Sequence, residues 1–178
     1  MTSGGEPAVG APRVLRDAPA GTGAALAALW LAVSREGGAV GFRPDAAEEL
    51  VLAAAEHVVS EVRAGREQMI VIETGDELAG SAFLRRGSGP IVEHRADVLR
   101  LMVHPDLQGR GWGTRLLDAA VAEAGAMGLR ELLLSARGGT PLPEFYAKQG
   151  WTEVGRWPRA LCVGPGDWRD EHWFHRAV

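Results

Sequence analysis

The stretch "HPDLQGRGWGTRLL", residues 104–117, places Gly109, Gly111 and Gly113 directly before an amphipathic segment. Glycine is costly to order and is a poor helix former, so three of them at a helix start need a local reason. The preceding run "ADVLRLMV" (96–103) is typical of a strand, and Pro105 ends it. Apolar residues then recur at helical spacing: Leu116, Leu117, Ala120, Val121 and Ala124. The sequence therefore predicts a strand, a glycine loop and a helix in direct succession.

The glycine loop has the properties of an anion site. The first N–H groups of a helix have no intrahelical partner, and the helix dipole adds partial positive charge there. A P-loop is excluded because no Lys-Ser or Lys-Thr pair follows the glycines, and the dinucleotide pattern G-x-G-x-x-G fails because Thr114 and Leu116 occupy its sixth position. The pattern that fits is Q-x-x-G-x-G on Gln108, Gly111 and Gly113. A glycine-rich turn without a ligand is the alternative.

The other predicted elements complete a mixed α/β domain over residues 13–178, after a disordered tail at residues 1–12. Thr22 is expected to cap a first helix, and Asp45 to cap a second that ends at Gly65. A helix at 142–150 carries Tyr146. Strands are expected at 13–18, 68–74, 78–86, 96–103, 130–136, 151–157 and 170–178.

Composition limits the class of protein further. With 178 residues the chain is long enough for one domain, and its net charge of −4 argues against general nucleic-acid binding. Cys162 is the only cysteine, so nothing points to an oxidising compartment. No run of 18 apolar residues exists that could span a membrane, and the N-terminus lacks signal-peptide character. We therefore expect a cytoplasmic protein without membrane association. His172 and His175 lie three apart in a predicted strand and so face opposite sides, which argues against a metal site.

Two motifs together carry a family resemblance. "LRLMVHPDLQGRGWG" resembles the strand, spacer and loop of the GCN5-related N-acetyltransferase (GNAT) superfamily, and "EFYAKQGW" (144–151) resembles its later tyrosine helix. The resemblance implies a mostly antiparallel mixed sheet flanked by helices, with splayed central strands that hold the pantetheine arm of acetyl-CoA. In that case backbone groups of Leu101, Met102 and Val103 pair with the arm. The resemblance further implies a cofactor-binding loop of Gln108, Gly109, Arg110, Gly111, Trp112, Gly113 and Thr114, in which the N–H groups of residues 109–114 would bind the pyrophosphate.

The resemblance also implies catalytic roles. Tyr146 matches the family's tyrosine, which acts as the proton donor to the thiolate of the leaving CoA. Asp97 stands six residues before Val103, where the similar histone acetyltransferase branch carries its glutamate base. Because aspartate is one methylene shorter, a bridging water is one way for it to act, and Glu93, His94 or water alone are the alternatives. The asparagine that family members often carry before the tyrosine helix is missing, and Thr140 or Ser135 are its candidate substitutes.

The expected activity is direct transfer of an acetyl group from acetyl-CoA to a primary amine of a small molecule or a protein, without a metal. A longer acyl-CoA donor and a non-catalytic CoA-binding sensor are the alternatives. Trp30, Phe42 and Trp157 are the candidate acceptor-binding residues, and a homodimer is possible because dimers are common among relatives.

Overall fold

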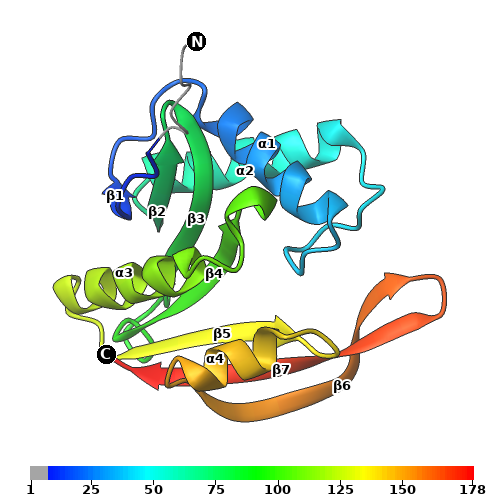
Figure 1. Cartoon of the computed structure of the whole chain (residues 1–178). Coiled ribbons are helices and arrows are strands. Elements are labelled where there is room, and N and C mark those ends of the chain that lie inside the picture. The colour runs from blue at the N-terminus through cyan, green and yellow to red at the C-terminus, as the bar shows by residue number, and fades with distance from the viewer. Residues whose placement is uncertain (1–7) are drawn as a thin grey trace.

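A seven-stranded sheet forms the centre of the domain (Figure 1). The computed structural model describes residues 8–178. Strand order is β1-β2-β3-β4-β5-β7-β6, and every neighbouring pair is antiparallel except β4–β5. The predicted fold class, a mixed and mostly antiparallel sheet flanked by helices, is confirmed. The strands are β1 (Arg13–Leu15), β2 (Glu67–Thr74), β3 (Glu77–Arg86), β4 (Arg95–Val103), β5 (Glu131–Arg137), β6 (Thr152–Gly164) and β7 (Asp167–Ala177).

Helices cover both faces of the sheet and give the domain two apolar cores. The first core lies under α1 (Thr22–Arg35) and α2 (Glu48–Arg63) and includes Trp30, Phe83 and Met102. The second lies under α3 (Trp112–Ala126) and α4 (Leu142–Lys148) and includes Leu116 and Tyr146. Figure 1 shows α1 and α2 beside the β2–β3 half of the sheet and α4 beside β5 and β7. A short 3-10 helix, η1 (Pro105–Leu107), connects β4 to the glycine loop.

The two central strands separate along their length. Only three residues of each strand pair: Arg95–Asp97 of β4 lie beside Glu131–Leu133 of β5. Both strands continue beyond that point without pairing to each other. A bulge in β4 accompanies the separation: Phe83 pairs with Leu99 and Ser81 with Met102, so two residues of β4 stand opposite one of β3. The splayed strands expected from the family resemblance are therefore present.

Both predicted helix caps are wrong. Gly21, at φ 88°, is the N-cap residue of α1, and the Thr22 hydroxyl instead donates to the Pro19 carbonyl at 2.8 Å. Ala47 is the N-cap residue of α2 and makes no side-chain cap, and Asp45 lies outside the helix. The preceding turns fix where these helices begin, and in α2 the acidic first turn (Glu48, Glu49) complements the helix dipole without a capping side chain.

The final hairpin is longer than the sequence predicted. The sequence predicts strands at 151–157 and 170–178, yet β6 continues through Pro158 to Gly164 and β7 begins at Asp167. β6 is the edge strand of the sheet, where the missing N–H of a proline costs no ladder bond, and its pairing is irregular between Trp157 and Leu161.

Two further boundaries differ at the N-terminal end. β1 ends at Leu15 rather than at residue 18. Residues 1–7 of the predicted tail lie outside the described residues, but within its remainder Val9 forms a bridge with Thr74 and the Gly10 N–H donates to the Glu73 carbonyl at 2.8 Å. Ordered contacts therefore begin before residue 13.

Candidate active site

A cavity of about 1060 Å³ runs between the diverging strands from the glycine loop to α1. Its walls come from β4, β5, the start of α3, α4 and the loop between α1 and α2. The lining includes these predicted site residues: Trp30, Phe42, Leu101, Met102, Val103, Gln108, Gly109, Gly111, Gly113, Thr114 and Tyr146. Residues far apart in the sequence thus meet around one space because the β4–β5 ladder stops at Asp97.

The glycine loop has the backbone geometry that an anion site needs. Gly109 and Gly111 have φ of 73° and 81°, in the left-handed region that side chains rarely adopt. Gly111 is the N-cap of α3, and the first intrahelical bond runs from the Arg115 N–H to the Gly111 carbonyl at 3.1 Å. The N–H groups of the first turn therefore have no helical acceptor and face the cavity end. This arrangement fits the diphosphate of a nucleotide-type ligand.

Side chains of the loop mostly brace it. Gln108 donates from Nε2 to the Val103 carbonyl at 3.0 Å, which fixes the loop against the end of β4. Trp112 stacks with Arg115, whose Cζ lies 4.5 Å from a Trp112 ring centroid. Neither Arg110 nor Trp112 is among the residues that line the cavity, so in this loop the backbone, rather than these two side chains, forms the cavity wall.

Tyr146 is buried in the second core and is one of the residues that line the cavity. Its ring contacts Phe145, Trp151 and Phe174 at centroid distances of 5.2, 6.3 and 5.8 Å. Burial raises the pKa of Tyr146 to about 12, so the phenol stays protonated at neutral pH. Among residues 8–178 the hydroxyl has no protein partner, and it is not one of the fully buried unpaired atoms. It is therefore available as a donor to a group in the cavity.

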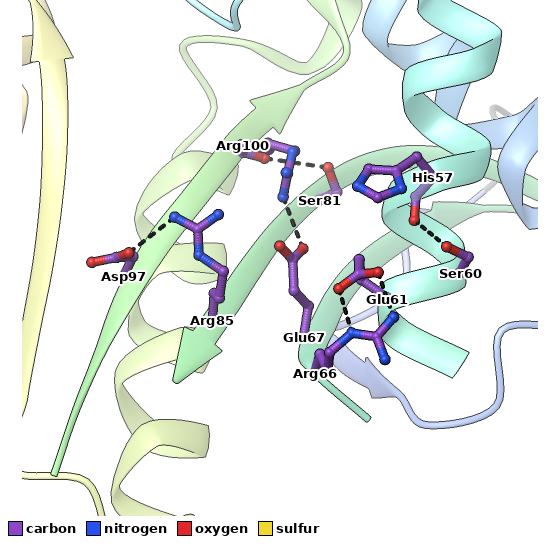
Figure 2. Close-up of polar contacts among 9 residues, drawn as sticks. All are labelled: His57, Ser60, Glu61, Arg66, Glu67, Ser81, Arg85, Asp97 and Arg100. Atoms are coloured by element: carbon purple, nitrogen blue, oxygen red, sulfur yellow. Dashed lines mark hydrogen bonds and ion pairs between the residues drawn. The ribbon is translucent and has the colours of Figure 1, made fainter. Parts of the chain in front are cut away.

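Asp97 lies at the last pair of the β4–β5 ladder, on the sheet face covered by α1 and α2 (Figure 2). Its carboxylate accepts from Arg85 Nη2 at 3.1 Å. Arg85 lines the cavity whereas Asp97 does not. A water molecule would have to connect this carboxylate with an acceptor in the cavity. Glu93 and His94 precede β4 and do not line the cavity either.

The β4 bulge is held by a buried ion pair that sequence analysis missed. Arg100 has φ 50°, and its Nη1 lies 2.9 Å from Oε2 of Glu67, whose side chain is 3% exposed. The guanidinium also lies 5.9 Å from the Trp30 ring centroid and 5.3 Å from that of Phe83 (Figure 2 shows the ion pair). A signal was present: in "ADVLRLMV" strict alternation would have put Arg100 on the face of Ala96 and Val98, inside the second core. The bulge resolves that conflict by turning the arginine to the other face.

Comparison with known proteins agrees with this geometry. The model of the acetyltransferase (GNAT) domain family matches residues 65–153, from the start of β2 to the start of β6. The chain belongs to the GNAT acetyltransferase family. A mycothiol acetyltransferase of Nocardiopsis dassonvillei is 35% identical over 105 residues, which are 56% of this chain and 29% of that protein. The match thus spans less than a third of that relative's length.

Solved GNAT structures share the fold. A GNAT acetyltransferase of Streptococcus pneumoniae superimposes with a TM-score of 0.75 and 19% identity, over 94% of this chain and 99% of that one. An acetyltransferase of Salmonella typhimurium, solved with its cofactor acetyl-CoA, gives 0.69 and 18%, over 94% of each chain. At these identities the likeness establishes the architecture, including the order of elements around the cleft.

The GNAT domain places two of the three expected acceptor residues at the cavity. Trp30 and Phe42 meet edge to face with centroids 5.1 Å apart, and Trp30 Nε1 donates to the Val40 carbonyl at 2.7 Å. Trp157 instead lies on β6, 64% exposed, and does not line the cavity. Of the candidate asparagine substitutes, Thr140 donates its hydroxyl to the Arg137 carbonyl at 2.7 Å, whereas Ser135 is an exposed residue of the lining.

The histidines near the C-terminus have structural partners. His172 Nδ1 lies 2.9 Å from Glu153 Oε1, and His175 Nε2 bonds with Glu131. Within residues 8–178, no group of three His, Cys, Asp or Glu side chains is close enough together to hold a metal ion. In the same part of the chain no helix is long and apolar enough to cross a membrane.

Proposed function

We propose that this GNAT domain catalyses direct transfer of an acetyl group from acetyl-CoA to a primary amine. The observation that carries the proposal is the cleft itself: strands that diverge after Asp97 and lead to a helix N-terminus preceded by two left-handed glycines. A turn without a ligand would not need an adjoining cavity of about 1060 Å³. When bound, acetyl-CoA supplies an activated thioester and a thiol leaving group.

The loop amides are the main grip on the diphosphate. Each charge-assisted hydrogen bond to a phosphate oxygen contributes about 1.5–3 kcal/mol, whereas an exposed side-chain charge contributes about 1 kcal/mol or less. Residues 109–114 therefore set affinity through backbone geometry, and Gln108 preserves that geometry by its bond to Val103. Leu101, Met102 and Val103 line the cavity where a pantetheine arm would lie as an additional strand.

Tyr146 assists departure of the thiolate by hydrogen bonding. Its burial keeps the phenol protonated, and its hydroxyl has no competing protein acceptor among the described residues. The amine acceptor must also lose a proton, because an alkylamine with a pKa of about 10.4 is almost fully protonated at neutral pH. We assign this step to Asp97 acting through a water molecule, supported by its place on the α1–α2 face at the vertex of the cleft.

Release of free thiol from acetyl-CoA in the presence of an amine panel tests the proposal. Isothermal titration with CoA, run in parallel, measures cofactor binding without turnover. Binding together with amine-dependent thiol release supports the transferase. Binding without turnover on any amine would favour the sensor alternative, and faster turnover with a longer acyl-CoA would favour the broader acyltransferase. Failure to bind CoA would contradict the proposal outright.

The role of Asp97 is tested separately. Asp97→Asn is expected to lower kcat/KM at pH values where the acceptor amine is protonated, and to lower it less at high pH where the amine is already neutral. CoA affinity should stay unchanged, because Asp97 does not line the cavity. Arg86→Gln, an exposed position on the neighbouring strand β3, is the control. An unaltered pH profile in Asp97→Asn would assign the proton to water alone.

A further inference from the structure

A second cavity of about 370 Å³ adjoins the first on the side of the α1–α2 loop. The two cavities share lining residues from that loop (Gly37, Phe42) and from β5 (Ser135, Arg137). Residues 160–163 of β6 close the far side of the smaller cavity. The smaller cavity therefore extends the large one away from the glycine loop.

Arg137 stands where the two cavities meet. Leu134 and Ala136 point into the second core under α3 and α4, so the alternation of β5 turns Ser135 and Arg137 to the α1–α2 face. Arg137 Nη2 donates to the Gly37 carbonyl, which ties the end of β5 to the loop. The side chain is thus on the acceptor side of the sheet, on the opposite face from the α3 helix start that would bind the diphosphate.

This guanidinium is half-buried without a counterion. Among residues 8–178 no carboxylate lies at salt-bridge distance from it. Burial lowers the pKa of Arg137 and nearby Arg169 lowers it further, while Asp167 opposes both effects only in part. Asp167 is itself engaged by Arg169 through two hydrogen bonds, at 2.6 and 3.0 Å. A partly desolvated cation of this kind is unfavourable until an anion joins it.

The charges around the smaller cavity indicate which anion fits. Its lining holds two cations, Arg43 and Arg137, and one carboxylate, Glu171. One positive charge therefore remains, which matches a monoanion, and Glu171 would repel a dianionic phosphate. The planar fork of an arginine also pairs well with a carboxylate.

We propose that the acceptor amine carries a carboxylate, and that Arg137 binds this carboxylate in the smaller cavity while the amine reaches the large one. This inference rests on the proposed transferase function and names its substrate class as amino acids or compounds with an amino-acid-like carboxylate. Arg137 is then a specificity-determining residue, because it selects among amines without touching the thioester.

Product mimics test the proposal before the acceptor itself is identified. N-acetyl amino acids and their C-terminal amides form matched pairs that differ only in the carboxylate. Each pair is titrated into CoA-loaded protein and followed by calorimetry or by NMR. We expect at least one carboxylate form to bind about tenfold to a hundredfold more tightly than its amide.

Three variants connect the preference with Arg137. Arg137→Gln should reduce the ratio to about one, and Arg137→Lys should keep part of it because the charge remains. Arg16→Gln, an exposed arginine just after β1, should leave it unchanged. Equal binding of both forms, no binding of either, or a preference that survives Arg137→Gln would overturn the proposal. CoA titration of the same samples separates this failure from failure of the transferase assignment.

Discussion

Tyr146→Phe removes one hydroxyl from the proposed reaction centre and leaves the ring in place. The ring packs against Phe145, Trp151 and Phe174, and phenylalanine keeps those contacts. The lost hydroxyl has no hydrogen-bond partner among residues 8–178, so no buried group is left unpaired. We therefore expect the melting temperature and the affinity for CoA to stay nearly unchanged while kcat falls.

The raised pKa of Tyr146 determines how large the effect is. The phenol has a pKa of about 12 and a thiol has a pKa of about 8.5. Full proton transfer from Tyr146 to the thiolate is therefore unfavourable by about 3.5 pKa units, or about 5 kcal/mol. In the proposed reaction we therefore expect Tyr146 to act as a hydrogen-bond donor and not as the final proton source. Such a bond to a charged acceptor contributes about 1.5–3 kcal/mol, so kcat should fall by about tenfold to a hundredfold.

The assay has two parts because the chain contains a single tyrosine. First, phenolate absorbance of the folded protein reports the Tyr146 pKa directly, and it should rise near pH 12 in the native state but near pH 10 after unfolding. Second, thiol release at saturating acetyl-CoA gives kcat for both proteins. A native transition near pH 10 would refute the desolvation argument, and a Tyr146→Phe enzyme within twofold of the parent would refute the donor role.

Three further predictions concern the loop, the bulge and alkaline stability. Gly111 (φ 81°) precedes α3 and Gly128 (φ 73°) follows its far end, and both have open space around the position of a Cβ. Gly111→Ala and Gly128→Ala should therefore each lower stability by about 1–2 kcal/mol, but calorimetry should show weaker CoA binding only for Gly111→Ala. Arg110→Ala should weaken CoA binding by less than about fivefold, and equal losses for Arg110→Ala and Gly111→Ala would contradict the backbone account. Glu67→Gln should lower the free energy of unfolding in urea by about 2–3 kcal/mol, because it leaves a largely buried guanidinium without its counterion, and an unchanged midpoint would show that the pair contributes nothing. The Tyr146 phenol stays protonated up to about pH 12 in the folded protein but ionises from about pH 10 in the unfolded chain. The free energy of unfolding should therefore be unaffected by this group below pH 10 and should decrease by about 1.4 kcal/mol per pH unit between pH 10 and 12. Urea titrations measure this decrease, and Tyr146→Phe should abolish it.

Local chemistry along the chain was sufficient to predict much of the site. The glycine loop needs left-handed backbone at Gly109 and Gly111, and only glycine adopts it at little cost, so the sequence pattern and the structure agree there. Element order followed from hydrophobic periodicity, and the pairing of the loop with the Tyr146 helix was sufficient to predict the family and its fold class. Caps were less well predicted, because the turns before α1 and α2 decide where those helices start.

Tertiary structure alone decided which side chains meet across the sheet. Arg100 finds Glu67 only because a bulge turns it out of the second core, and Arg137 meets the Gly37 carbonyl across 100 residues of sequence. Asp97 lies on the sheet face covered by α1 and α2, where Arg85 from the neighbouring strand donates to its carboxylate. These partners depend on strand register and on a one-residue bulge, and neither is encoded in local propensity because each is set by packing between distant segments. The sequence thus determined the left-handed glycine loop before α3, whereas the folded sheet determined which charged side chains line the cavity.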